Sequence, residues 1–150
     1  MTKNWLKRKL QKKNCRKKNT ENRQWKIMVN DEVACVFAIT FEDESTWKEK
    51  NINKAVYFYR IVTHPNFRGK KFVEKIIVWG KKLGKEKNLN FLRIDTWGDN
   101  DALINYYQQC GFSFLRIITP DYKNLSRHYE GINLSLFEID LKNCPIKYNR

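Results

Sequence analysis

The stretch HPNFRGKKFVEKIIVWG, His64 to Gly80, joins an apolar segment to an amphipathic one through a positively charged turn. Before it, AVYFYRIVT (55–63) is apolar at odd and even positions alike, which is typical of a central strand covered on both faces. After the turn, apolar residues recur at helical spacing up to a glycine that predicts the helix end: Phe72, Val73, Ile76, Ile77, Leu83 and Gly84. The stretch therefore predicts a strand, a turn and a helix.

The turn itself is cationic, because Arg68, Lys70 and Lys71 lie close together in it. A turn that leads into a helix presents unpaired backbone N–H groups and the positive end of the helix dipole, and both favour a phosphate or a diphosphate. A basic first turn also occurs on ordinary protein surfaces. The turn alone leaves both interpretations open.

Further elements are expected on both sides of this stretch. Asn30-Asp31 separates two β-branched segments, 24–29 and 32–41, and predicts a hairpin. Residues 42–54 are polar and are expected to form a loop. A strand is expected at 91–97, followed by a helix at 99–110 that has an Asp or Asn cap and ends at Gly111. Two more strands are expected at 112–118 and 134–140. This order predicts an α/β domain with helices packed on a mixed sheet.

Composition limits the class of protein. The 150 residues, of which 41% are hydrophobic, suffice for one compact domain but not comfortably for two. The sequence has neither a run of about 18 apolar residues nor a hydrophobic signal core, so we expect a cytoplasmic protein without membrane contact. The four cysteines form no CxxC pair and there are two histidines, so we expect reduced thiols and no metal site.

The net charge of +14 is concentrated near the N-terminus. Residues 1–26 contain eleven Lys or Arg and a single acidic residue, Glu21. We expect residues 1–23 to form a basic arm or a short helix and residues 24–150 to form the domain. Either the arm keeps the protein soluble, or residues 1–26 contact RNA or another polyanion. Whether the N-terminus is complete is left open.

Two motifs, in the right order, resemble those of the GNAT superfamily of N-acetyltransferases. The turn NFRGKKFV follows the family's coenzyme-binding pattern, with Arg68 in the first position and Lys71 and Val73 where small residues are usual. Asn100, Tyr107 and the Gly-Phe pair 111–112 follow the second motif. The resemblance implies a mostly antiparallel central sheet flanked by helices. Because the basic N-terminal segment is short, the acceptor side is expected to be open or to be covered by a partner.

Acetyl-CoA is the co-substrate that the resemblance implies. The pantetheine arm would pair with backbone groups at Ile61, Val62 and Thr63, as an added strand does. The diphosphate would lie over the turn and the first residues of the helix: Arg68, Gly69, Lys70, Lys71, Phe72 and Val73. Asn100 would contact the pantetheine arm. From the helix pattern alone, Asn100 is equally a helix N-cap.

Acetyl transfer from a thioester to an amine needs a neutral amine, stabilisation of the oxyanion and a proton for the departing thiolate. The resemblance makes Tyr107 the proton donor, because a phenol is protonated at pH 7. From the helix pattern alone, Tyr106 and Tyr107 are core aromatics. The proton acceptor is not identified, since several carboxylates are equally consistent with a solvated or structural role: Glu42, Asp43, Asp95 and Glu130.

The leading hypothesis is therefore an acetyl-CoA-dependent N-acetyltransferase that acts on a primary amine, either a small molecule or a peptide. His64 is expected to shape the turn, and His128 and Tyr129 could line the acceptor pocket. The alternative is a non-catalytic module of the same fold that binds RNA or another polyanion through its basic arm. A homodimer is left open.

Overall fold

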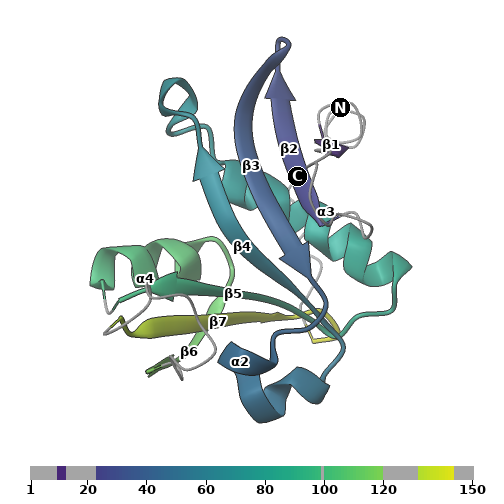
Figure 1. Ribbon diagram of the computed structural model, residues 1–150, viewed down its shortest axis with the longest axis vertical. Helices are drawn as coiled ribbons and strands as arrows, with labels where there is room; N and C mark the ends of the chain where they lie inside the picture. Colours follow the sequence, from purple (N-terminus) through teal and green to yellow (C-terminus); the bar gives the residue numbers. More distant parts are fainter. Residues whose placement is uncertain (1–9, 13–22, 99, 120–131, 144–150) are drawn as a thin grey trace.

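The computed structural model describes residues 10–12, 23–98, 100–119 and 132–143. A seven-stranded sheet with the order β1-β2-β3-β4-β5-β7-β6 forms its centre (Figure 1). The pairing of β4 with β5 is parallel and every other neighbouring pair is antiparallel. The strands are β1 (Leu10–Lys12), β2 (Gln24–Val29), β3 (Glu32–Thr40), β4 (Ala55–Thr63), β5 (Phe91–Trp97), β6 (Ser113–Ile118) and β7 (Leu134–Asp140). The expected mixed, mostly antiparallel sheet is confirmed.

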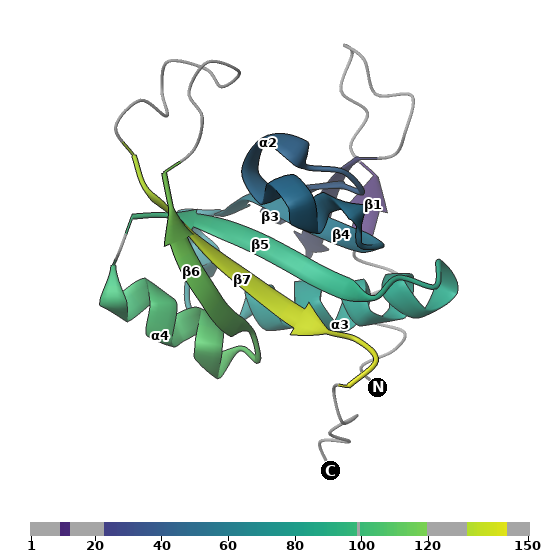
Figure 2. The ribbon, with the colours of Figure 1, turned by 90° about the horizontal axis from the view of Figure 1, so that it is seen from below.

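Helices cover both faces of the sheet. The long helix α3 (Phe72–Glu86) and α4 (Asp101–Gln109) lie on one face, whereas α2 (Glu44–Trp47) lies on the other (Figure 2). The 3-10 helix η1 (Lys48–Ile52) continues directly from α2, and η2 (Pro65–Phe67) forms part of the turn between β4 and α3. Each face of the sheet therefore has its own apolar cluster.

The larger cluster lies between the sheet and helices α3 and α4. Trp79 of α3 packs its ring against Trp25 of β2 and Phe37 of β3, at centroid distances of 4.9 Å and 5.4 Å. Gly80 lets the helix approach β4 closely, since a Cβ there would lie 2.8 Å from Phe58 Cζ. Helix α3 is thereby held firmly on the strands that precede it.

The smaller cluster lies under α2 and consists of Trp47, Ala55, Tyr57 and Leu136. It shows that residues 42–54 were wrongly expected to be a loop. The Asp43 side chain accepts a hydrogen bond from the Thr46 backbone N–H at 3.2 Å and so caps α2. Trp47, only 1% exposed, then anchors this short helix to the sheet. Tertiary burial of one tryptophan, rather than local periodicity, stabilises the segment.

Two other expectations need correction. Helix α3 does not end at Gly84 but continues to Glu86, and Asn88 at φ 55° supplies the left-handed residue after it. Gly84 is instead buried inside the helix, where Leu141 packs against it. Strand β4 is covered on both faces only over its first four residues, while its second half alternates between half-buried and exposed positions.

Most of the basic N-terminal segment lies outside the described residues. Within it, Leu10–Lys12 form β1 and pair with β2. The expected acceptor-pocket residues His128, Tyr129 and Glu130 also lie outside the described residues. In the part of the chain that the structure describes, no helix is long and apolar enough to cross a membrane.

Candidate functional site

The sheet opens between its two parallel strands. The register of β4 with β5 ends at the pair Phe58 and Ile94, although β4 continues to Thr63 and β5 continues to Trp97. Figure 1 shows the two strands diverging beyond this point. On its other side, β4 remains paired with β3 as far as Thr63. Among the described strands, none pairs with the diverging edge of β4, so an extended ligand could bind there as an added strand.

A bulge in β4 lies inside this opening. The register with β3 shifts between Val36 and Ala38, and Arg60 takes a left-handed φ of 53°. An extra residue of this kind bends the strand and increases its local twist. The bulge therefore helps to turn the end of β4 away from β5, and it lies just before the residues that were expected to pair with pantetheine.

Those residues, Ile61 to Thr63, alternate in direction. Ile61 packs against the core on the α3 face, and the Thr63 hydroxyl hydrogen-bonds the Cys35 thiol at 3.8 Å. Val62 points the other way and is 59% exposed. Because only main-chain groups are needed for strand addition, this mixture of side chains is compatible with the expected role.

The strand leads directly into the cationic turn. The His64 side chain accepts a hydrogen bond from the Asn66 backbone N–H at 3.1 Å, so it shapes the turn as expected. Gly69 has φ 79°, and a Cβ there would have no atom within 4 Å, so its backbone faces open space. Arg68, Lys70 and Lys71 are exposed around it.

The helix N-terminus that follows carries no side-chain cap. Lys71, in the N-cap position, adopts the left-handed conformation and makes no capping hydrogen bond. Phe72 and Val73 are buried in the core on the α3 face, so their side chains point away from the turn. The N–H groups of the first turn are thus presented together with three cationic side chains, and this combination suits a diphosphate.

Tyr107 of α4 is 8% exposed. Its ring packs against Phe137 and Phe112, with centroids 5.2 Å and 6.0 Å away. Burial, reinforced by the Cys110 thiol and the Asp95 carboxylate, raises the pKa of Tyr107 to about 12. The phenol is therefore a core aromatic and is also fully protonated at neutral pH, so it can donate a hydrogen bond.

Asn100 acts as the N-cap of α4. Its Oδ1 accepts hydrogen bonds from the backbone N–H groups of Ala102 and Leu103, at 3.0 Å and 3.3 Å. The side chain is exposed, and its amide nitrogen is not used in these bonds. The capping interpretation is confirmed, while the expected contact with pantetheine stays a prediction.

Of the candidate proton acceptors, Asp95 has the most unusual environment. Burial raises its pKa to about 7, and the negative charge of Asp43 adds to the effect. Asp43 itself is a half-buried helix cap, whereas Glu42 is exposed. Asp95 is also the first residue of β5 beyond the last pair with β4, so it lies where the opening begins.

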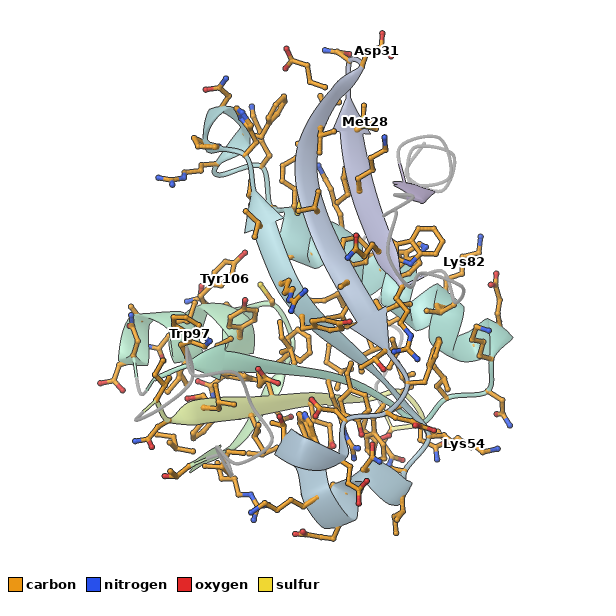
Figure 3. The ribbon with its side chains drawn as sticks, in the orientation of Figure 1. Met28, Asp31, Lys54, Lys82, Trp97 and Tyr106 are labelled. Atoms are coloured by element: carbon orange, nitrogen blue, oxygen red, sulfur yellow. The ribbon has the colours of Figure 1, made fainter. Side chains whose placement is uncertain are left out.

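Exposed aromatic side chains border the same region. Trp97 at the end of β5 is 56% exposed and Tyr106 of α4 is 40% exposed. Both lie at the end of the molecule where β4 and β5 have separated, far from Lys54 and Asp31 (Figure 3). Flat apolar rings beside the opening are suited to contact with a ligand's apolar parts.

The feature that sequence reasoning missed is Arg93. It lies in the middle of β5 and is 0% exposed, with its guanidinium 4.8 Å from the Trp47 ring centroid. The signal in the sequence was an arginine between Leu92 and Ile94 in the expected strand FLRIDTW. A buried arginine requires several hydrogen-bond partners, and their identity depends on the fold.

Taken together, these features define an α/β domain whose sheet opens between β4 and β5, beside a cationic turn and a helix N-terminus without a side-chain cap. The sequence model of the Acetyltransferase (GNAT) family matches residues 3–112, and the protein belongs to this family. A comparison with curated protein sequences finds no match.

Several solved structures share the fold. A GNAT acetyltransferase from Listeria monocytogenes is 24% identical, with a TM-score of 0.59 over 79% of this chain and 65% of its own. A Bacillus subtilis acetyltransferase in complex with CoA is 18% identical, with a TM-score of 0.57 over 78% of this chain and 75% of its own. A spermidine N-acetyltransferase chimera from Vibrio cholerae and hSSAT is 15% identical, with a TM-score of 0.58 over 80% of this chain and 67% of its own. At these identities the likeness establishes the fold. The chain spans about two thirds of the Listeria protein's length (65%).

Proposed function

We propose that the protein transfers an acetyl group from acetyl-CoA to a primary amine. The observation that carries this proposal is the unpaired edge of β4, which ends in a cationic turn and an uncapped helix N-terminus. The Bacillus subtilis relative, which was solved with CoA, supports a ligand of this type.

In the proposed complex, the pantetheine arm pairs with the main chain of Ile61–Thr63 on the side that β5 leaves free. The diphosphate lies over residues 68–73, where it accepts hydrogen bonds from backbone N–H groups. The exposed side chains of Arg68, Lys70 and Lys71 add charge-assisted contacts, which are about twice as strong as neutral ones. Val73, buried in the core, leaves the turn clear.

The reaction forms a C–N bond and breaks the C–S bond of the thioester. The amine must lose its ammonium proton before it attacks, and the departing thiolate must gain one. Tyr107 is the proposed donor to the sulfur, and the nitrogen of the tetrahedral intermediate supplies the proton that restores the phenol. The overall products are the amide, the free thiol of CoA and one proton released to solvent.

The raised pKa of Tyr107 refines this role. A phenol with a pKa of about 12 is a weaker acid than a thiol with a pKa of about 8.5, by roughly 3.5 units. Complete transfer to a free thiolate would therefore be uphill by about 5 kcal/mol. We infer that Tyr107 donates a strong hydrogen bond to the sulfur while negative charge develops there, and that its proton moves to the sulfur as the nitrogen of the intermediate restores the phenol, so that no free phenolate forms.

The acceptor is proposed to be a small amine or a peptide amine. Spermidine, named for the Vibrio cholerae chimera, is one member of this class. The comparisons give no support to the alternative, a non-catalytic module that contacts a polyanion through residues 1–26.

Titration calorimetry with acetyl-CoA tests the proposal directly. We expect binding at micromolar coenzyme, and an Arg68→Ala variant should bind about tenfold more weakly, because one charge-assisted contact to phosphate is lost. Arg116→Ala is the matched control, since this exposed arginine lies on β6 and outside the turn. Absence of binding at millimolar acetyl-CoA would overturn the proposed function.

A second measurement addresses transfer. Release of the CoA thiol is followed with spermidine, a lysine-containing peptide and a free amino acid as acceptors. We expect at least one amine to accelerate release above the rate with acetyl-CoA alone. Tight coenzyme binding without any amine-dependent release would favour a non-catalytic protein.

A further inference from the structure

Arg93 is the most completely enclosed charge among the described residues. Its Nε donates to Glu138 Oε2 at 2.9 Å, and its Nη1 donates to the Lys50 carbonyl at 2.8 Å and to the Tyr57 hydroxyl at 2.9 Å. Its Nη2 donates to Asn53 Oδ1 at 2.8 Å. The guanidinium also lies 4.7 Å from the ring centroid of Phe91.

Two of these contacts fix the segment that covers this face of the sheet. Lys50 and Asn53 belong to η1 and its C-terminal cap, and both are held to β5 by the same guanidinium. Trp47 lies over Arg93 at 4.8 Å, so α2 is fixed as well. A planar, permanently charged fork is well suited to hold several groups in one geometry.

The same network extends to Asp43. The Tyr57 hydroxyl, which accepts from Arg93, donates to Asn51 Oδ1 at 3.3 Å. Asn51 Oδ1 also accepts from the Asp43 backbone N–H at 2.7 Å. A continuous path of hydrogen bonds therefore runs from Arg93, through Tyr57 and Asn51, to the residue that begins α2.

Asp95 lies two residues beyond Arg93 on β5, so both side chains point to the α2 face of the sheet. It is opposite Leu136 of β7 and follows the last residue that pairs with β4. Two titratable groups of other elements interact with it: the charge of Asp43, before α2, raises the pKa of Asp95, and the charge of Asp95 contributes to the raised pKa of Tyr107 on α4. Along β5, the charge of Arg93 is neutralised by Glu138 of β7.

We propose that Asp95 is the proton acceptor for the amine and that Arg93 is a positioning residue, which holds the start of α2, and with it Asp43, in place through Tyr57 and Asn51. This inference rests on the proposed acetyl transfer and names the group that prepares the acceptor. Asp43 does not touch the amine in this account. Burial is the main reason that the pKa of Asp95 is raised, and the charge of the Asp43 carboxylate adds to it.

The chemistry explains why the neighbouring charge matters. Transfer of a proton from an ammonium with a pKa of about 10 to a carboxylate at about 4 is unfavourable by about a million-fold. Transfer to Asp95, whose pKa burial and Asp43 raise to about 7, is unfavourable by only about a thousandfold. Asp95 then releases this proton to solvent, and the second proton of the nitrogen follows the route through Tyr107 to the sulfur.

The first test is a titration of the ligand-free protein by carbon NMR of the aspartate carboxyl groups, with the Asp95 signal assigned by its loss in Asp95→Asn. We expect an Asp95 midpoint near pH 7. In Asp43→Asn the midpoint should fall by about one unit, since a like charge has been removed. Asn51→Ala and Tyr57→Phe should shift it in the same direction, because each breaks the path to Asp43. Glu44→Gln, an exposed acid on α2 outside the network, should leave it unchanged.

The second test is the pH dependence of kcat/KM with the best amine of the acceptor panel. The acidic limb should move to lower pH in Asp43→Asn and in Tyr57→Phe, and Asp95→Asn should lower kcat at least a hundredfold with acetyl-CoA affinity unchanged. A merely structural network would lower activity at every pH without moving the limb.

The two proposals fail separately. If acetyl-CoA does not bind, the proposed function is wrong, but the NMR titration still measures the Asp95 midpoint and its dependence on the hydrogen-bond network. An Asp95 midpoint below pH 5, or a midpoint that does not change in Asp43→Asn, would overturn the inference even in an active acetyltransferase. Because Tyr57→Phe and Asn51→Ala retain the Arg93–Glu138 pair, the test does not depend on a variant that fails to fold.

Discussion

Breaking the Arg93–Glu138 pair should destabilise the protein more than any other single charge removal among the described ion pairs. In Glu138→Gln the guanidinium stays buried, with its side chain 1% exposed, and its ionic partner at 2.9 Å becomes neutral. Removal of one member of a buried pair typically costs about 3–5 kcal/mol, because the remaining charge is left uncompensated. We expect the lower end of this range, because Lys50, Tyr57 and Asn53 still accept hydrogen bonds from the guanidinium.

The assay is urea unfolding followed by tryptophan fluorescence, since Trp47 lies directly over Arg93. A loss of about 3 kcal/mol corresponds to a melting temperature about 6–12 °C lower for a domain of this size. The control is Glu49→Gln, which breaks the exposed pair with Arg116 at 3.6 Å, where the Glu49 side chain is 73% exposed. That change should leave stability unaltered.

The double variant Arg93→Met with Glu138→Leu separates charge from packing. If the loss in Glu138→Gln comes from an unpaired buried charge, removal of both charges should recover much of it. If the unfolding free energy of Glu138→Gln lies within about 0.5 kcal/mol of the parent value, the change is no larger than that of an ordinary surface substitution. This result would refute the view that Arg93 is buried as a charge.

Three further outcomes are expected. Tyr107→Phe should lower kcat about a hundredfold with unchanged acetyl-CoA affinity, and equal turnover would remove the phenol from the mechanism. Gly80→Ala should lower the unfolding free energy by about 1–3 kcal/mol, because the new Cβ would lie 2.8 Å from Phe58. Asp95→Asn should raise the unfolding free energy at pH 8 but not at pH 4. The Asp95 carboxyl group has a pKa near 7 in the folded protein and near 4 in the unfolded chain, so the folded protein loses stability as the pH rises between these values. Since Asp95 keeps some contact with solvent, we expect about 2 kcal/mol, roughly half of what a three-unit difference allows.

Much of the fold could be predicted because local signals agree with tertiary structure. The bounds expected for β4, β5 and β7 are those observed, since each strand is a short apolar run between turn residues. The cap of α4 at Asn100 and its end at Gly111, with φ 106°, follow from residue type alone.

What could not be predicted depends on contacts between distant segments. The Asp43 cap is a weak local signal for the helix ESTW, because the stability of α2 comes mainly from Trp47, which packs on a buried arginine more than forty residues later. Likewise, Gly84 marks a helix end by type, but Leu141 packs on it and the helix continues. The opening beside β4 is also invisible in sequence, since it requires both the register with β5 and the bulge at Arg60.

Asp95 gives the strongest physical reason to look for chemistry on the α2 face. Burial, to which the charge of Asp43 adds, raises the pKa of Asp95 to about 7, so we expect the folded protein to be less stable at neutral pH than it would be with an amide at this position. A residue that only filled space or accepted a hydrogen bond would not need that charge. The hydrogen bonds from Arg93 through Tyr57 and Asn51 keep Asp43 in place, so the protein maintains the unfavourable arrangement rather than relaxing it. A carboxylate with a raised pKa at the opening between two strands is suited to remove a proton from an amine, and this is the role we propose for Asp95.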